Sequence, residues 1–193
     1  MKIEEFERLI EGETETQKID FKESCPWNKD SFAKDILAFS NVRGGGYLVI
    51  GIREIKGGIE RQGISDRHLA TYDSEAMLDQ LSAYADPRVD IVLDPVDEDK
   101  NKKRYLVIII KEFQDVPVIC KKDGKEIKKG IIYYRNTDRR PESAPVSNSS
   151  DMRDIIDLAV VKMMKKYREL GLAPESKDEE LFDKELEELE KEK

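Results

Sequence analysis

The sequence predicts an α+β fold, with a mixed, largely antiparallel sheet, packed helices and a C-terminal helical extension. Three observations support this prediction. Segments with helical spacing are inserted among segments with strand spacing, and most strand candidates follow one another through short polar turns. Residues 47–52 form an apolar run of the kind found in strands that are covered on both faces. The chain has 193 residues, which is enough for one domain and a short appendage.

Each element follows from local spacing and from the residues that bound it. Ile3, Phe6, Leu9 and Ile10 recur at helical spacing, whereas Ile19 and Phe21 alternate with polar residues as in a half-buried strand. Glycines close helices, and Asp or Ser residues cap them. In order, the expected elements are helix 3–11, strand 18–23, a helix from residue 30 to the glycines at 44–46, strand 47–52, a turn at 56–58, helix 73–85, strands 89–96, 104–112, 116–121 and 131–135, and helix 151–170.

The last helix and the segment after it are expected to differ in burial. Helix 151–170 has an apolar set broad enough to be buried, namely Ile155, Ile156, Leu158, Ala159, Val160, Met163 and Met164. Residues 171–193 are expected to be an acidic tail outside a domain formed by residues 1–170. In the tail, Leu181, Phe182, Leu186 and Leu189 lie at helical spacing among acids. The tail is either a solvated, partly disordered segment or a helix that binds a partner, forms a homodimer or folds back over a basic surface.

Composition excludes several classes of protein. No apolar run approaches the roughly 20 residues of a membrane span, and the N-terminal segment is acidic and amphipathic, so we expect a soluble cytoplasmic protein without membrane contact. Cys25 and Cys120 are too few for a disulfide framework or a zinc site. His68 is the single histidine, which argues against a metal site built from several histidines.

The distribution of charge is more informative than its total. The formal net charge is -8, yet residues 99–140 carry thirteen basic and six acidic side chains. Such a block supplies phosphate contacts in nucleic-acid-binding proteins, although a solvated hairpin would have the same composition. Tyr133 and Tyr134 lie beside it, and one of them could stack on a base. The basic candidates for nucleic-acid binding are Lys102, Lys103, Arg104, Lys121, Lys122, Lys125, Lys128, Lys129, Arg135, Arg139 and Arg140.

The three glycines at 44–46 favour a structural role over phosphate binding. A phosphate-binding loop runs from strand to glycines to helix and ends in Gly-Lys-Ser/Thr, whereas here the order is helix, glycines, strand. The dinucleotide pattern Gly-x-Gly-x-x-Gly is also absent. We therefore expect a helix end and a tight entry into a buried strand, and no nucleotide cofactor.

Four charged residues form the candidate catalytic set. Asp20 and Lys22 lie on one face of a predicted strand, Glu15 lies just before it, and Glu54 ends another strand. Acids and a lysine that converge on a sheet can hold Mg²⁺ or Mn²⁺ and stabilise a phosphate under attack. A solvated strand face has the same pattern, so spacing alone leaves both interpretations open.

Three segments, taken together, resemble the Schlafen AlbA-like domain family. They are "ETQKIDFKES", "DILAFSNVRGGGYLVIGIRE" and "GIIYYRNTDRRPESAP", in this order. The resemblance covers about residues 13–165, and Asn41 to Gly51 is its most specific part. It implies an AlbA-like domain over residues 1–170 that binds nucleic acid.

The resemblance also implies an activity and a site. Better understood members of the family are metal-dependent endoribonucleases that cut structured RNA such as tRNA. Their acidic triad falls on Glu15, Asp20 and Glu54, with Lys22 as the companion base. Two departures matter, because Asp20 stands where glutamate is usual and Glu54 where aspartate is usual. The alternative is a non-catalytic DNA- or RNA-binding regulatory module, with RNA favoured over DNA.

Overall fold

The computed structural model describes residues 1–12, 14–98, 102–136 and 141–172 and confirms the α+β class. The central sheet has the strand order β1-β2-β7-β6, formed by β1 (Ile19–Lys22), β2 (Gly46–Ile50), β7 (Lys103–Ile110) and β6 (Ile91–Glu98). β1 and β2 are parallel and the other pairs are antiparallel, so the sheet is mixed. Two-stranded sheets pair β3 (Ile52–Ile55) with β4 (Gly58–Arg61), β5 (Ala85–Asp86) with β8 (Ile119–Cys120), and β9 (Tyr133–Asn136) with β10 (Glu142–Pro145).

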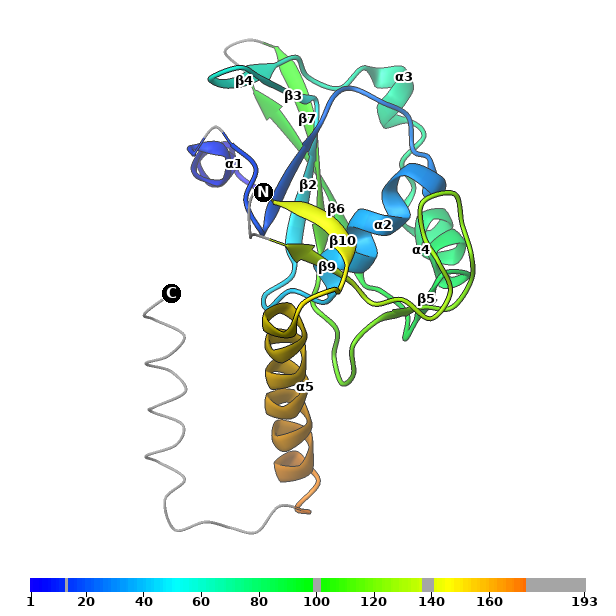
Figure 1. Cartoon of the computed structure of the whole chain (residues 1–193). Coiled ribbons are helices and arrows are strands. Elements are labelled where there is room, and N and C mark those ends of the chain that lie inside the picture. Colours follow the sequence, from blue (N-terminus) through cyan, green and yellow to red (C-terminus); the bar gives the residue numbers. More distant parts are fainter. Residues whose placement is uncertain (13, 99–101, 137–140, 173–193) are drawn as a thin grey trace.

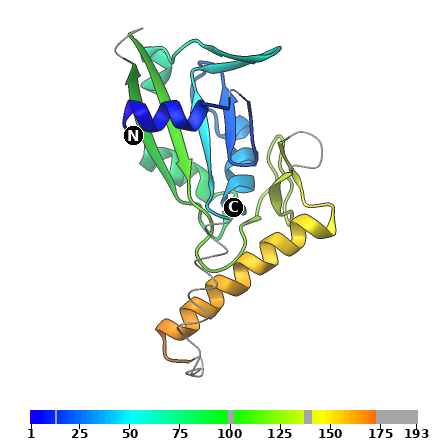
Figure 2. The same cartoon turned by 90° about the vertical axis from the view of Figure 1, so that its left-hand side faces the viewer.

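Helices cover both faces of the central sheet (Figures 1 and 2). On one face, α1 (Ile3–Ile10) inserts Phe6 and Ile10 against the sheet, where Phe6 stacks on Tyr105. The other face carries the larger core, to which α2 (Lys29–Ser40) and α4 (Ser74–Ser82) contribute, together with β9. A short α3 (Asp66–Leu69) and α5 (Ser149–Glu169) complete the described helices. Apolar side chains on both faces explain why the central strands have few exposed positions.

The β1–α2–β2 unit, a parallel crossover, carries the charged residues Asp20 and Lys22 on its first strand. α2 is capped by Asn28, whose side chain accepts a hydrogen bond from the Asp30 amide. At its other end, Asn41 donates to the carbonyls of Val118 and Tyr133, and its side-chain oxygen accepts from the Val118 amide. Asn41 is 1% exposed, so these bonds satisfy a buried amide while they hold two distant segments against the end of α2.

The glycines after α2 have the predicted structural role. Gly45 has φ 72°, and a Cβ atom there would lie 2.0 Å from the backbone oxygen of Ile110. At Gly46, a Cβ atom would lie 2.0 Å from the Phe39 ring. Only glycine therefore allows the chain to leave the helix and enter β2 beside β7.

Several expected elements differ in extent. The strand expected at 47–52 breaks at Gly51, which has φ 106° and accepts hydrogen bonds from Gln62 and Gly63, so the chain turns into β3 there. The strand expected at 116–121 shortens to two residues. The segment between the strand expected at 131–135 and the helix expected at 151–170 contains β10, which pairs with β9. Helix α3 was not expected, because a single turn has too little apolar spacing to detect.

Only one side of α5 is buried, contrary to the expectation for its whole apolar set. Ile155 and Leu158 pack into the core, whereas Ile156, Val160, Met163 and Met164 are 37–49% exposed. The helix extends away from the sheet (Figure 2), so the body contacts only one of its sides. The rest of the expected acidic tail, from residue 173 onward, lies outside the described residues.

Candidate functional site

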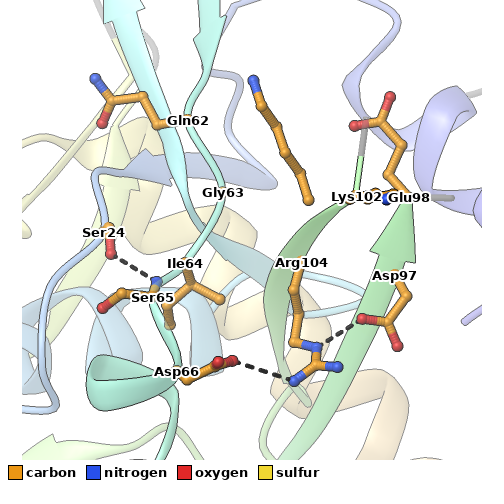
Figure 3. A pocket seen from close by; sticks show the side chains of 11 residues that line it. Ser24, Gln62, Gly63, Ile64, Ser65, Asp66, Asp97, Glu98, Lys102 and Arg104 are labelled. Atoms are coloured by element: carbon orange, nitrogen blue, oxygen red, sulfur yellow. Dashed lines mark hydrogen bonds and ion pairs between the residues drawn. The ribbon is translucent and has the colours of Figure 1, made fainter. Parts of the chain in front are cut away.

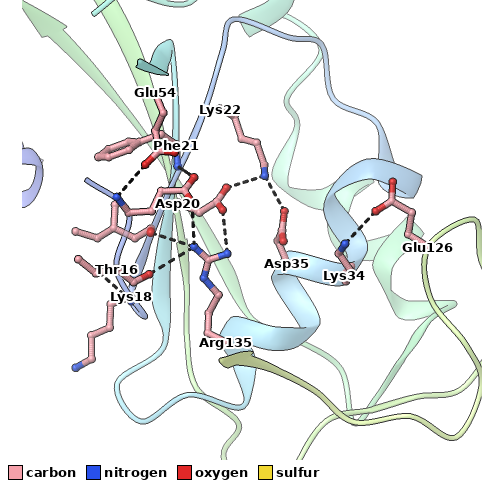
Figure 4. A network of polar contacts seen from close by, with 12 residues as sticks. Thr16, Lys18, Asp20, Phe21, Lys22, Lys34, Asp35, Glu54, Glu126 and Arg135 are labelled. Atoms are coloured by element: carbon pink, nitrogen blue, oxygen red, sulfur yellow. Dashed lines mark hydrogen bonds and ion pairs between the residues drawn. The ribbon is translucent and has the colours of Figure 1, made fainter. Parts of the chain in front are cut away.

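The candidate site is a charged cluster that joins β1, α2, β3 and β9 (Figure 4). We define the charged cluster as Glu15, Asp20, Asp35 and Glu54 with the two cations Lys22 and Arg135. Its position follows from β1, where Ile19 and Phe21 pack toward α1 and alternation turns Asp20 and Lys22 toward α2. Four of the six residues were predicted as the catalytic set, and Arg135 was predicted only as a nucleic-acid contact.

Arg135 lies at the centre of this cluster. Its side chain is 2% exposed, and Nη1 donates to Asp20 Oδ1 over 2.9 Å. Nη2 donates to the carbonyls of Thr16 and Ile19 and lies 3.8 Å from Glu15 Oε2. The guanidinium also lies over the Phe39 ring, 5.0 Å from its centroid. Arg135 is therefore an internal cation, and the expectation that it contacts nucleic acid at the surface is wrong for this structure.

Lys22 bridges two buried acids. Its Nζ lies 2.7 Å from Asp20 Oδ2 and 3.0 Å from Asp35 Oδ2, which come from β1 and α2. Although burial by itself lowers the pKa of Lys22, Asp35 and Asp20 outweigh this effect, and the net pKa is raised. Lys22 therefore stays an ammonium ion at every physiological pH, which excludes it as a general base.

Glu15 is held beside the edge strand β1. Its Oε1 accepts a hydrogen bond from the Phe21 amide over 3.2 Å, which satisfies an outward-facing donor of the edge strand β1. The Glu15 amide in turn donates to Glu54 Oε1 over 3.2 Å. Burial, with contributions from Asp20 and Glu54, raises the pKa of Glu15 to about 7, and the hydrogen bond from the Phe21 amide and the charge of Arg135 offset only part of this rise. Glu15 is thus partly protonated near neutral pH.

The three predicted acids therefore lie in one neighbourhood, together with Asp35. Glu15 interacts electrostatically with both Asp20 and Glu54. Asp35 was missed, although the sequence contains a signal: it lies at helical spacing with the buried residues Phe32, Ile36 and Phe39, where an acid needs a partner. Among the described residues, no group of three or more His, Cys, Asp or Glu side chains is arranged to hold a metal ion.

Apart from Arg135, the predicted basic residues that the structure describes lie in two separate places. Lys102, Lys103 and Arg104 line a cleft of about 960 Å³ beside β6 and β7 (Figure 3). Arg104 is paired with Asp97 at 2.6 Å and with Asp66 at 3.4 Å, and Lys103 donates to the Arg61 carbonyl. Because acids from the same cleft already neutralise Arg104, this place offers little net positive charge to a phosphate.

The second place is the lysine loop, which we define as residues 121–129 between β8 and β9. Its five lysines, Lys121, Lys122, Lys125, Lys128 and Lys129, are all exposed. Within the described parts of the chain, none of these five ammonium groups forms an ion pair. The loop itself is anchored, because Ile127 is 3% exposed and Glu126 pairs with Lys34 of α2 at 3.2 Å. Lys34 precedes Asp35, so the lysine loop and the charged cluster flank the same helix (Figure 4).

The remaining predictions concern base stacking by two tyrosines, two further arginines and membrane contact. Tyr133 and Tyr134 are buried, and their hydroxyls take part in hydrogen bonds, Tyr133 with the Lys128 amide and Tyr134 with Gln17 and Asp154. Neither ring is therefore available to stack on a base, so that expectation is wrong. Arg139 and Arg140 lie outside the described residues. No described helix is long and apolar enough to cross a membrane.

An α+β domain that combines a charged cluster with an anchored, exposed lysine loop defines a class of protein suited to contact an anionic partner. The comparisons with known proteins identify the family. The model of the Schlafen, AlbA_2 family matches residues 15–142, so the chain belongs to this family, as the three sequence segments predicted. Membership suggests nucleic-acid binding.

One solved structure and the curated proteins complete the comparison. The chain is similar to the crystal structure of the DIP2311 protein from Corynebacterium diphtheriae, with 21% sequence identity and a TM-score of 0.45. The match covers 72% of this chain and 24% of that one, so the chain spans about a quarter of that protein's length. No curated protein matches.

Replacing Asp20 with asparagine tests whether the charged cluster supports the fold. Asp20→Asn leaves Arg135 buried without its closest counter-charge, so we expect the free energy of unfolding to fall by about 3–5 kcal/mol. The matched control is Asp90→Asn, which breaks the exposed Lys111–Asp90 pair and should cost less than about 1 kcal/mol. Urea unfolding measures both, and equal losses in the two variants would contradict the structural role of Arg135 and Asp20.

The raised pKa of Glu15 predicts a specific pH dependence of stability. The pKa is about 7 in the folded protein and 4.5 ordinarily, so the folded state favours the protonated acid. The contribution of Glu15 to stability is therefore fully present below about pH 4.5 and is lost as the pH rises through 7. Urea unfolding at about pH 5 and about pH 8 should show a larger loss in the native protein than in Glu15→Gln.

The control for this measurement is Glu23→Gln. Glu23 is exposed and pairs with Arg53 at 3.2 Å, so its replacement should leave the pH dependence of the native protein unchanged. If Glu15→Gln has the same pH dependence as the control, the carboxyl of Glu15 does not titrate near neutral pH.

Proposed function

We propose that the chain binds structured nucleic acid, RNA in preference to DNA, through the lysine loop. The observation that carries this proposal is the combination of five exposed lysines without ion-pair partners in the described chain and a loop held in place by Ile127 and by the Glu126–Lys34 pair. Binding a phosphate would break no ion pair of these lysines within the described chain. Because the loop is already anchored, it would also lose little backbone entropy. Family membership supports the same conclusion.

We further propose that the bound RNA is cut with the help of a divalent cation, Mg²⁺ or Mn²⁺. The support for this proposal is the chemistry of the donors, because carboxylate oxygens such as those of Glu15, Asp20 and Glu54 are the ligands that these cations prefer, although the described side chains are not arranged as a metal site in this structure. Glu15, Asp20 and Glu54 would hold the ion, with Lys22 beside them, and the ion would supply Lewis-acid stabilisation of the phosphate.

A second candidate function is a binding module that does not cleave. It is favoured by the pairing of Arg135 with Asp20 and by the proximity of Arg135 to Glu15, because a cation already occupies the side of these acids that faces β9. In this case the lysine loop would still bind nucleic acid, and the charged cluster would only stabilise the fold. Both candidates predict binding, and only the first predicts turnover.

Binding through the lysine loop is tested by Lys122→Ala together with Lys125→Ala. If both lysines contact phosphates, the dependence of log K on log salt should become shallower by about two, and affinity for an RNA hairpin should fall at every salt concentration. Fluorescence anisotropy over a salt series measures this effect. A DNA duplex of the same sequence, run in parallel, tests the preference for RNA.

The matched control removes the same charge elsewhere. Lys56→Ala with Lys111→Ala replaces two exposed lysines that lie outside the lysine loop. This variant should keep nearly the salt dependence of the native protein. A change of equal size in both double variants would show that net charge, rather than the lysine loop, determines binding.

Cleavage is tested with structured RNA in the presence of Mn²⁺ or of a chelator. We expect cleavage only with the cation, and a loss of about 100-fold or more in Glu54→Gln, which removes one oxygen ligand and keeps the side-chain shape. Gel electrophoresis of labelled RNA measures the products, and anisotropy confirms that Glu54→Gln still binds. Binding without any cation-dependent products in the native protein would overturn the nuclease proposal and leave the binding module.

A further inference from the structure

The outer side of α5 is an apolar surface without a partner among the described residues. It consists of five side chains that are 37–60% exposed, namely Ile156, Val160, Met163, Tyr167 and Leu170. The inner side is attached to the body by the buried side chains of Ile155 and Leu158 and by the Lys162–Glu112 ion pair, at 2.6 Å. These attachments fix the rotation of α5, so the apolar side stays turned away from the core.

The spacing of the exposed residues identifies the kind of partner. Positions 156, 160, 163, 167 and 170 follow steps of four, three, four and three, which is the a/d pattern of a coiled coil. We call this set of five residues the α5 seam. At 100° and 1.5 Å per residue, the seam is a single stripe about 21 Å long, about a third of a turn away from Ile155 and Leu158. Such a stripe fits another helix with the same spacing.

The charges of α5 make a second α5 the matching helix. Residues 149–158 carry three acids and one base, whereas residues 161–170 carry four bases and one acid. An antiparallel copy sets each acidic half against a basic half, and the two helix dipoles then oppose each other. A parallel copy would set like halves together. A symmetric interface needs one surface that is complementary to itself, and α5 meets this condition in the antiparallel orientation.

We propose that the chain forms a homodimer in which two α5 helices pack antiparallel along their seams. One register places four seam residues of each helix opposite seam residues of the other. In this register Ile156 lies against Tyr167 of the second copy, and Val160 lies against Met163 of the second copy. Because the pair has two-fold symmetry, each of these contacts occurs twice and all four apolar side chains are covered.

The same register brings opposite charges together at one border of the seam. Asp157 and Arg168 are eleven positions apart, so at 100° per residue they project from α5 within about 20° of each other. In the antiparallel pair, Asp157 lies within about 3 Å, measured along the helix axis, of Arg168 of the second copy. Asp157 is exposed and can reach across. The dimer therefore contains two such pairs, which fix its register and orientation.

Sedimentation equilibrium of the full chain tests whether the seam forms a dimer. We expect a monomer–dimer equilibrium between about 5 and about 200 µM protein. Val160→Ser with Met163→Ser removes four buried apolar side chains from each dimer and should raise the dissociation constant at least about 100-fold. A native chain that is monomeric over the whole range would overturn the proposal. A dimer that this double variant leaves unchanged would place the contact elsewhere and overturn it as well.

Exchange of the two charges tests the antiparallel orientation. Asp157→Arg and Arg168→Asp each set two like-charged pairs across the dimer and should weaken it about 10-fold. An equimolar mixture of these two variants can form a heterodimer with both pairs opposite in charge, and the chain that carries both substitutions can do so by itself. Both should regain the dissociation constant of the native chain. A mixture that associates no better than either variant alone would overturn the antiparallel orientation.

A matched control separates the seam from general effects of substitution on α5. Lys165 is exposed and projects from the side of the helix opposite to the seam, so Lys165→Ser should keep the dissociation constant of the native chain. Thermal unfolding followed by circular dichroism checks that each variant is folded. An equal loss of dimer in Lys165→Ser and in Val160→Ser with Met163→Ser would contradict the assignment of the interface to the seam.

Discussion

The ion pair between Arg135 and Asp20 is the interaction on which the rest of the site depends. It joins β9 to β1, which belong to different sheets. The two residues of the pair lie 115 positions apart in the sequence. Both side chains are almost fully buried, so neither charge can be satisfied by water if the other moves. Arg135 also donates to the carbonyls of Thr16 and Ile19 and therefore orders the turn that places Glu15 beside β1.

The same arrangement sets the electrostatics of the charged cluster. Arg135 and Lys22 together supply two positive charges, and four carboxyl groups surround them. Arg135 lies 3.8 Å from the carboxylate of Glu15 and 2.9 Å from that of Asp20, so it compensates the charge of Asp20 more strongly than that of Glu15. The raised pKa of Glu15 follows mainly from the burial of its carboxyl group, with further contributions from Asp20 and Glu54.

The sequence predicted the elements better than their burial. Alternation around Phe21 and the helical spacing of Phe32, Ile36 and Phe39 are local, and the structure contains the corresponding β1 and α2. Strand alternation predicts that Asp20 and Lys22 lie on the same face of β1. It gives no information about which residue of β9 lies against that face. Arg135 carried a misleading signal, because it lies within a basic stretch and looks exposed. Its burial depends on Asp20, which is remote in sequence and has no local pattern that marks it as a partner.

Net charge is a poor guide to partners in this chain, because the structure keeps its charges in separate places. Arg104 faces acids across the cleft, and Arg135 faces acids in the interior, so neither adds to the field outside. The lysine loop differs, since its backbone is anchored through Ile127 and Glu126 while its ammonium groups remain exposed. Screening limits each charge to about 8 Å at physiological salt, so a phosphate close to the loop responds to the lysines and hardly to the distant acids. A chain with a formal net charge of -8 can for this reason present a local surface that attracts a polyanion.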